Sequence, residues 1–481
     1  MSEGPRIGKD EWVERHAERR TGRAGAVRVV EERLKGVPWW AWLTLFLGLV
    51  ALLPVPVDNG YWRRVAFDTV LFMLLALGLN VVVGWGGLLD LGYVAFYGVG
   101  AYTYAIFRSP QFDLHWPALV VIAIAVVAGA LLGLLVGLPS WRLTGDYLAI
   151  VTLFGFQIFN SILINGDDLF GADVTSGVNG ILNVDPLSFF GHVVPVGNDG
   201  VFNVAYLYIA LTALAVVFVA LRMIDRSRTG RAWRSIREDP LAAELMGMPV
   251  DWLKLLAFAS GASVAALTGT LFAALNGAVF PTNFELALLI QIYAMMILGG
   301  AGSQAGALLG AVLISVMLEL LREADDSRYV FYVVVLAGLV AVFRFSRRLV
   351  IVLGGTVVLG FGLRLVVDAA DGSWTGPAAE DSGWLGRLAA DWVVVPTQLS
   401  TWVGSLAYVG LIGMALWLTL LSGWARVAVL VPTLYLASFV WENLMAPHPE
   451  VTRFVLLGAL LVAAMVARPE GILGEKRVEV V

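Results

Sequence analysis

Cysteine is absent from the 481 residues of this chain, which excludes disulfides and thiolate metal sites. The four histidines are scattered and form no ligand-like cluster, so the sequence predicts no metal site. Charge is also scarce: 14% of the residues are charged, whereas a soluble domain usually carries about 25%. The phosphate-binding motif GxxxxGKS/T and the catalytic motifs HExxH and GxSxG are missing. We therefore expect no catalytic residues and no nucleotide or other cofactor bound by this chain.

Hydrophobic residues are what the sequence has in excess, at 59%, and its mean hydropathy is +0.81. They form continuous blocks of about 17–24 residues, the length that a helix needs to cross a bilayer. Lipid offers the backbone no hydrogen-bond partner, so spans are helices or closed barrels, and continuous blocks exclude the barrel. We predict an all-α polytopic membrane protein with about 14 transmembrane helices. The predicted spans are 38–55, 65–85, 86–107, 116–139, 146–164, 201–223, 255–280, 284–300, 304–321, 329–345, 349–367, 404–421, 425–441 and 453–467.

The distribution of Lys and Arg predicts the orientation of these spans. If the N-terminus is inside and the spans alternate, the inner segments hold most of the Lys and Arg, and the loop 222–254 is among them. The large outer loops 165–200 and 368–403 are acidic, and Arg387 is their one basic residue. Because cytoplasmic loops are rich in Lys and Arg, we expect a protein of the cytoplasmic membrane with both termini in the cytoplasm.

The basic loop 222–254 also encodes a short helix outside the membrane. Asp239 is a good N-cap, Pro240 suits the first helical position, and Gly247 suits the residue after a helix end. Upstream, three arginines spaced by three share one helical face: Arg231, Arg234 and Arg237. The segment is either an ordinary connecting helix anchored to lipid headgroups or a contact for a partner protein.

Two glycine-rich segments, 80–104 and 298–311, interrupt or join predicted spans. Glycine lets helices approach closely, and it can also mark a break whose freed backbone groups line a cavity. Asp90 is the acid nearest the first break, and an ionisable group at membrane depth suggests a function. The candidate substrate path consists of Asn80, Gly84, Gly87, Asp90, Thr152, Gln157, Gly299, Gly300, Gly302 and Ser303. The same small and polar groups would also suit helix packing.

Several runs of the sequence together resemble the LivM-type permeases of branched-chain amino acid ABC importers. The most specific run is SRTGRAWRSIREDPLAAELMGMPVDWLKLLAFASGAS at 227–263. The others are LALGLNVVVGWGGLLDLGYVAFYGVGAYTYA (75–105), LTGDYLAIVTL (143–153), TSGVNGI (175–181), LGGAGSQAGALLGA (298–311) and RFVLLGALLVAAMVARPEGILG (453–474).

The resemblance implies a set of partners and a role for the basic loop. The expected partners are ATPase subunits that bind ATP and magnesium, a second homologous permease, an extracytoplasmic solute-binding protein and membrane lipids, with no nucleic acid. The short helix in the loop would be held by the ATPase and would couple ATP hydrolysis to transport. The residues expected to carry this coupling are Arg231, Arg234, Arg237, Glu238, Asp239, Ala242, Ala243, Glu244 and Gly247. Leucine, isoleucine and valine are the substrates that the resemblance implies.

The resemblance also divides the chain. We expect a cytoplasmic tail over 1–37, a family-like core over 38–321, an inserted membrane region over 322–452, and a family-like last helix and tail over 453–481. Three alternatives remain open: a urea or short-amide ABC permease, an ion-coupled secondary transporter and a membrane enzyme. Uptake that persists without a partner ATPase would favour the secondary transporter, and activity of the purified chain on a lipid or peptide would favour the enzyme.

Overall fold

The computed structural model describes residues 48, 60–143, 145–168, 173–189, 192–198, 201–322, 324–343, 346–370, 401–467 and 470–474. The predicted tail 1–37, nearly all of the predicted span 38–55, most of the loop 368–403 and the last residues 475–481 lie outside this part. Within it, the chain is an all-α polytopic membrane protein. Nine of the described helices are long and apolar enough to cross a membrane.

A first group of helices forms the core of the described chain. Its long members are α4 (Gly60–Leu79), α5 (Tyr93–Phe107), α6 (Ala118–Gly137), α7 (Asp146–Ile164), α8 (Val204–Arg226), α11 (Val250–Asn276), α12 (Leu286–Gly299) and α13 (Gln304–Leu320). The most apolar stretch of each helix is buried to a different extent. The buried share is 83% in α4 together with the turn that follows it to Trp85, 72% in α11 and 22% in α6. The first two therefore form the centre, and α6 lies outside them.

Close contacts of small residues allow α11 to occupy this central position. It packs against α4, α5 and α6. A Cβ at Gly133 of α6 would lie 2.6 Å from the Cβ of Ala262 in α11, and one at Gly269 of α11 would overlap the carbonyl of Tyr97 in α5. Lipid does not drive apolar helices together, so packing of this kind holds membrane helices to one another.

The span predicted over 86–107 begins later than expected. A π-helical turn over Asn80–Trp85 extends α4, and α5 begins only at Tyr93. The residues between them are irregular, and Gly87 has a φ of +66°. This left-handed conformation favours glycine and ends the helix. The first glycine-rich segment is therefore a break between helices, which we call the first break (residues 86–92).

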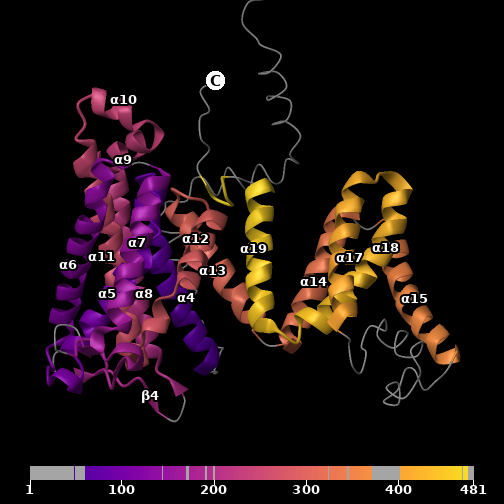
Figure 1. Ribbon diagram of the computed structural model, residues 1–481, viewed down its shortest axis with the longest axis horizontal. Helices are drawn as coiled ribbons and strands as arrows, with labels where there is room; N and C mark the ends of the chain where they lie inside the picture. The colour runs from indigo at the N-terminus through magenta and orange to yellow at the C-terminus, as the bar shows by residue number, and fades with distance from the viewer. Residues whose placement is uncertain are drawn as a thin grey trace, which may run out of the picture.

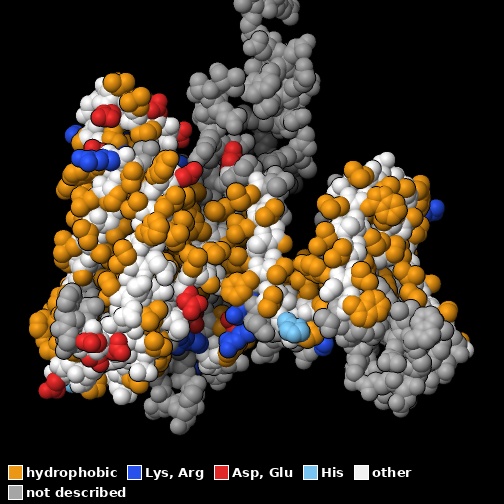
Figure 2. Space-filling view, viewed as in Figure 1, with side chains coloured by type: hydrophobic (Ala, Val, Ile, Leu, Met, Phe, Trp, Pro, Cys, Tyr) orange, Lys and Arg blue, Asp and Glu red, His pale blue; other side chains and the backbone are white. Residues whose placement is uncertain are grey.

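The two ends of the core differ in structure (Figure 1). At one end lie the short helices α9 (Arg228–Glu238) and α10 (Pro240–Leu245). At the other lie three two-stranded antiparallel ribbons. They pair β1 (Ile181–Leu182) with β6 (Ala278–Val279), β2 (Ser188–Phe189) with β3 (His192–Val193), and β4 (Gly197–Asn198) with β5 (Val201–Phe202). We call these the α10 end and the β4 end. Between them, hydrophobic side chains cover the flank of the core (Figure 2).

A second group of helices stands beside the core. It contains α14 (Ala324–Phe343), α15 (Arg347–Ala370), α17 (Thr401–Leu420) and α18 (Gly423–Val440), and a π-helical turn (Trp441–Met445) leads from it to α19 (Pro449–Ala467). Small apolar clusters hold this group, one of them formed by Leu339, Leu349, Val352 and Val427. In contrast, Leu457 of α19 belongs to the main core cluster, so the last long helix returns to the core (Figure 1).

Candidate functional site at the α10 end

The predicted short helix is present, and both of its ends are capped as the sequence indicated. The backbone N–H groups of Leu241 and Ala242 donate to Oδ1 of Asp239 at 2.9 and 3.0 Å, and Pro240 occupies the first helical position. These bonds satisfy two of the donors that a helix start leaves free. The helix α10 is therefore specified locally by its own sequence.

The other end of α10 closes with a Schellman motif. The N–H of Gly247 donates to the carbonyl of Glu244 at 2.8 Å, and the N–H of Met248 donates to that of Ala243 at 3.1 Å. Gly247 has a φ of +79°, and a Cβ there would meet nothing within 4 Å. The requirement for glycine is therefore conformational rather than steric.

The helix α10 presents an apolar tip to the surroundings. Leu241, Leu245 and Met246 are 66%, 80% and 81% exposed, while Ala243 is buried against the chain. Of the other residues predicted for coupling in this region, Glu238, Asp239, Ala242, Glu244 and Gly247 are all exposed. Three neighbouring exposed apolar side chains at the tip of a protruding helix are typical of a protein-contact surface.

The three arginines of α9 have different surroundings. Arg231 is exposed, and its guanidinium donates to the carbonyl of Arg226 at 3.0 Å. Arg234 pairs with the buried carboxylate of Asp225. Arg237 points into the core. Arg234 and Arg237 thus fasten α9 to the bundle, whereas Arg231 contacts the backbone at the last residue of α8.

Arg237 reaches the first break. Its Nη1 donates to the carbonyl of Gly84 at 2.6 Å. A Cβ at Gly87 would lie 3.0 Å from Cγ of Arg237, and one at Gly302 would lie 2.6 Å from its Nη1. One side chain therefore touches Gly84 and Gly87 of the first glycine-rich segment and Gly302 of the second, which lies more than 200 positions further along the chain.

The second glycine-rich segment packs directly on the first. The N–H of Gly302 donates to Oδ1 of Asn80 at 2.7 Å, and Nε1 of Trp85 donates to the carbonyl of Gly302 at 2.9 Å. The ring of Trp85 stacks on that of Trp233 in α9, with centroids 6.2 Å apart. The two segments and α9 thus form one hydrogen-bonded and stacked unit, which we call the junction.

Three other residues of the second glycine-rich segment, Gly299, Gly300 and Ser303, have packing and capping roles. A Cβ at Gly299 would overlap the carbonyl of Gly306, so α12 and α13 touch there. Oγ of Ser303 accepts from the N–H of Gly306 at 3.1 Å and caps α13. Gly300 lies against Gly471 and Gly474, so the segment after α19 also meets the junction.

Two main-chain hydrogen bonds fix that last segment. The N–H of Ile472 donates to the carbonyl of Leu298, and the N–H of Leu473 donates to that of Gly299, both at 2.9 Å. The junction therefore joins four stretches of the chain: the first break with the turn before it, α9, residues 298–303 and residues 470–474.

Asp90 and Thr152 lie together on the other side of the first break. Asp90 is fully buried, and its Oδ1 accepts from the N–H of Gly92 at 2.8 Å. Oγ1 of Thr152 accepts from the N–H of Leu91 at 2.9 Å, and the hydroxyl of Tyr293 donates to the carbonyl of Asp90 at 2.6 Å. These bonds satisfy backbone groups that the break removes from the helix ladder, as membrane depth requires.

Gln157 lies apart from the other path candidates. It is exposed on the outer face of α7, where it lines a shallow pocket of about 320 Å³ with Ser161 and Asn165. The structure therefore brings together Asn80, Gly84, Gly87 and Gly302 at the junction, with Gly299, Gly300 and Ser303 beside them, and places Asp90 with Thr152. Gln157 is the one candidate that none of these groups includes.

The sequence did not single out three residues that contact the two glycine-rich segments: Trp85 and Trp233 in the junction, and Tyr293 of α12 beside Asp90. Each is an aromatic side chain with a polar tip in or near a predicted break, and such side chains, when buried, usually bond a partner. The sequence could therefore have predicted that these side chains form hydrogen bonds, but it does not indicate which carbonyl accepts each bond.

Among the described residues, no group of three or more His, Cys, Asp or Glu side chains could hold a metal ion. The site consists of an exposed apolar helix tip, an arginine strut and two glycine breaks inside a helical membrane bundle. These features fit a class, the polytopic membrane transport proteins.

The family comparison agrees with that class. Residues 62–343 match the family model described as the branched-chain amino acid transport system / permease component, and the chain belongs to this family. The match continues through α14, beyond residue 321, where the sequence analysis ended the family-like core. The division of the chain at that point stays a prediction.

Individual relatives give the same result. The chain is 36% identical over 301 residues to the high-affinity branched-chain amino acid transport system permease protein LivM of Escherichia coli strain K12, covering 59% of this chain and 69% of that protein. It is 37% identical over 303 residues to LivM of Salmonella typhimurium, with the same coverage. It is 24% identical over 342 residues to the fructose import permease protein FruG of Bifidobacterium longum, covering 66% of this chain and 93% of the relative. No solved structure matches.

Proposed function

We propose that this chain is the membrane-spanning subunit of an ATP-driven ABC importer that carries branched-chain amino acids into the cell. A separate ATPase would bind the α10 tip, a second homologous permease would complete the pathway, and an extracytoplasmic binding protein would deliver the solute at the β4 end. The observation that carries the proposal is the direct contact between the α9–α10 unit and both glycine breaks through Arg237.

The distribution of charge supports the proposed orientation. The α10 end carries the arginines of α9, and basic residues favour the cytoplasmic side. Acidic side chains gather near the β4 end of the core (Figure 2), where the described loops hold Asp167, Asp168, Asp173 and Asp185. This distribution of charge supports an α10 end on the cytoplasmic side, where an ATPase could reach it.

The coupling step is a rigid-body motion of α9 and α10. When ATPase subunits close on ATP, a push on the α10 tip moves α9, because only the capped turn at Asp239 separates the two helices. The side chain of Arg237, which contacts Gly84 and Gly302, transmits this displacement to them. Helix breaks are suited to such motion, since their backbone is not held by a continuous ladder of hydrogen bonds.

Two buried polar atoms support a solute path beside the junction. Within the described chain, neither Nδ2 of Asn80 nor Oδ2 of Asp90 has a hydrogen-bond partner. Buried polar groups normally find partners, and a passing zwitterion offers both an acceptor and a donor. These atoms suit an amino acid or a short amide such as urea, which is the second substrate class.

One relative, FruG, is named as a fructose permease, so the relatives are not all named for the same substrate. The substrate of this chain therefore needs a test of its own, separate from the test of the transport class. Binding of leucine, isoleucine and valine, but not urea, by the associated binding protein supports the first class. Uptake that survives removal of the ATPase would instead favour an ion-coupled carrier.

Labelling of single cysteines tests the orientation, because the chain has no native cysteine. Leu245→Cys places a thiol at the α10 tip, and Val193→Cys is the matched control, 60% exposed at the β4 end. In intact cells a membrane-impermeant maleimide is expected to modify the control and leave the α10 thiol unmodified. In inside-out vesicles the pattern reverses.

The same variant tests the partner. A bifunctional cross-linker at Leu245→Cys is expected to join the chain to an ATP-hydrolysing subunit, and ATP is expected to change the yield. Labelling of the α10 thiol from outside intact cells would overturn the orientation. A purified, transport-competent assembly without such a subunit would overturn the whole proposal.

A further inference from the structure

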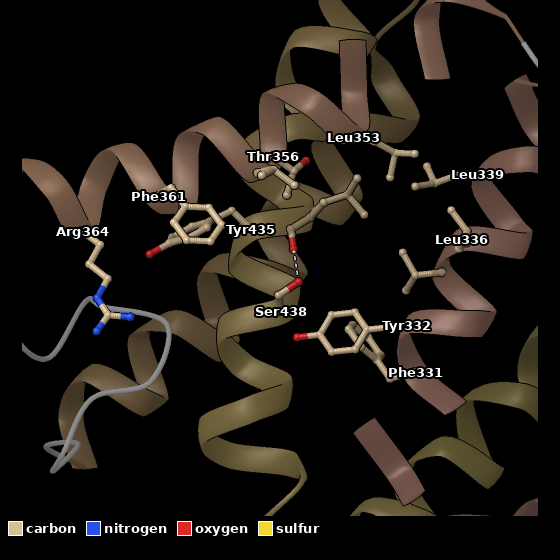
Figure 3. Close-up of a pocket in the computed structure, with 14 residues that line it drawn as sticks. Phe331, Tyr332, Leu336, Leu339, Leu353, Thr356, Phe361, Arg364, Tyr435 and Ser438 are labelled. Atoms are coloured by element: carbon tan, nitrogen blue, oxygen red, sulfur yellow. Dashed lines mark hydrogen bonds between the residues drawn. The ribbon is translucent and has the colours of Figure 1, made fainter. Parts of the chain in front are cut away.

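A wedge-shaped cavity lies in the second helix group, outside the junction. It has a volume of about 560 Å³ and is lined by side chains from α14, α15 and α18 (Figure 3). This volume falls within the range of about 300–1,000 Å³ that is usual for ligand pockets. We propose that the wedge binds one anionic glycerophospholipid, with an acyl chain between the helices and the phosphate at Arg364.

The walls of the wedge are mostly apolar. Leucine, valine and aromatic side chains make up most of the lining. The hydroxyl of Thr356 donates to the carbonyl of Val352 at 2.8 Å, and that of Ser438 donates to the carbonyl of Leu434 at 3.0 Å. Because these hydroxyl donors are used within their own helices, the walls suit hydrocarbon better than a polar solute.

The length of the wedge fits one leaflet. Leu353 and Leu339 lie at one end of the cavity and Arg364 at the other (Figure 3). Leu353 and Arg364 are eleven positions apart on α15, which corresponds to about 16 Å along a helix. This is roughly half of a hydrocarbon core of about 30 Å, so the wedge accommodates a chain from a single leaflet.

The charge at the outer end favours an anion. Arg364 lies within the apolar stretch of α15, and it forms no ion pair with the residues whose side chains the structure describes. On the opposite wall, Oε2 of Glu442 is 2.8 Å from Nε of Arg328, and Oε1 of Glu442 accepts from the hydroxyl of Tyr332 at 2.9 Å. The acid is thus paired, so no described carboxylate of the wedge competes with an external phosphate for Arg364. A charged group inside a membrane span normally has such a partner.

The position of the wedge identifies the source of its ligand. Phe361, Val357 and Leu336 are exposed at the level of the membrane-spanning helices, where the surrounding solvent is lipid. A molecule that reaches them comes from the bilayer, and the phospholipid is the bilayer component with both a long apolar chain and an anionic group. The inference does not depend on the proposed transport function.

Native mass spectrometry of the purified full-length chain tests the proposal with phosphatidylglycerol and phosphatidylcholine as probes. We expect the first phosphatidylglycerol to bind more tightly than phosphatidylcholine. Arg364→Gln is expected to weaken it about fivefold, the contribution of one basic residue near an anionic surface. Val357→Trp fills the wedge and is expected to abolish this first binding event.

Two variants serve as controls. Val358→Trp adds the same bulk at a neighbouring site that is 70% exposed and does not line the wedge. Arg348→Gln removes the same charge from α15 at an arginine that lies over the ring of Trp424, with 5.6 Å between its Cζ and the ring centroid. Both controls are expected to bind like the wild type. Equal binding by Arg364→Gln and Val357→Trp, equal affinity for phosphatidylcholine, or an equal loss in either control would overturn the proposal.

Discussion

Replacing Arg237 with alanine tests whether the junction transmits force. The substitution removes the donor to the carbonyl of Gly84, at 2.6 Å, and the methylenes that pack on Gly87. A hydrogen bond from a charged group contributes about 1.5–3 kcal/mol to stability, and the lower value applies to this half-buried side chain. A loss of about 1.5 kcal/mol shifts the equilibrium between the state in which α9 is bound to the first break and the state in which it is detached roughly tenfold.

The assay is uptake and ATP hydrolysis measured together in proteoliposomes that contain the whole importer. We expect the Arg237→Ala importer to hydrolyse ATP while solute transported per ATP falls by up to about tenfold. The physical reason is that α10 still binds the ATPase, but its displacement no longer reaches the first break. Arg237→Lys keeps the charge without the planar fork and is expected to be intermediate.

Arg228→Ala is the matched control, since this exposed arginine lies on the same helix and is not among the residues predicted for coupling. It is expected to leave the ratio unchanged. If Arg237→Ala transports with normal stoichiometry, or if both variants lose coupling equally, Arg237 is not the link between α9 and the breaks.

Three further predictions concern single elements. Asp239→Ala is expected to cost α10 about 1 kcal/mol and to reduce uptake, whereas Asp239→Asn keeps a cap and stays near the wild type; an equal loss in both would indicate a role for charge instead. Thr152→Val removes the hydroxyl that accepts from the partly buried N–H of Leu91, so the free energy of unfolding in detergent is expected to fall by about 1 kcal/mol, with rescue by Thr152→Ser. Gly299→Ala puts a methyl group into the backbone of α13 and is expected to lower the yield of monodisperse protein in size-exclusion chromatography, whereas Gly155→Ala, with nothing within 4 Å, is tolerated.

The sequence alone determined the features that depend on local chemistry. Apart from the first break, the long apolar blocks correspond to helices where the structure describes them, because membrane depth requires each segment to satisfy its own backbone. The caps at Asp239 and Gly247 were likewise predictable, since each involves residues only a few positions apart. Family membership followed from these runs and is confirmed by the match over 62–343. The coupling and path roles of single residues stay predictions.

Only the tertiary structure decided which face of each helix points inward. It turned Arg237 into the junction and Gln157 out of the core, and it joined the tail at 470–474 to residues 298–303. In a soluble protein the apolar face of a helix marks the core. In a membrane the lipid-facing side is as apolar as the buried side, so hydropathy locates a span along the chain but not its rotation. That rotation is set by contacts between residues far apart in sequence, such as Asn80 with Gly302.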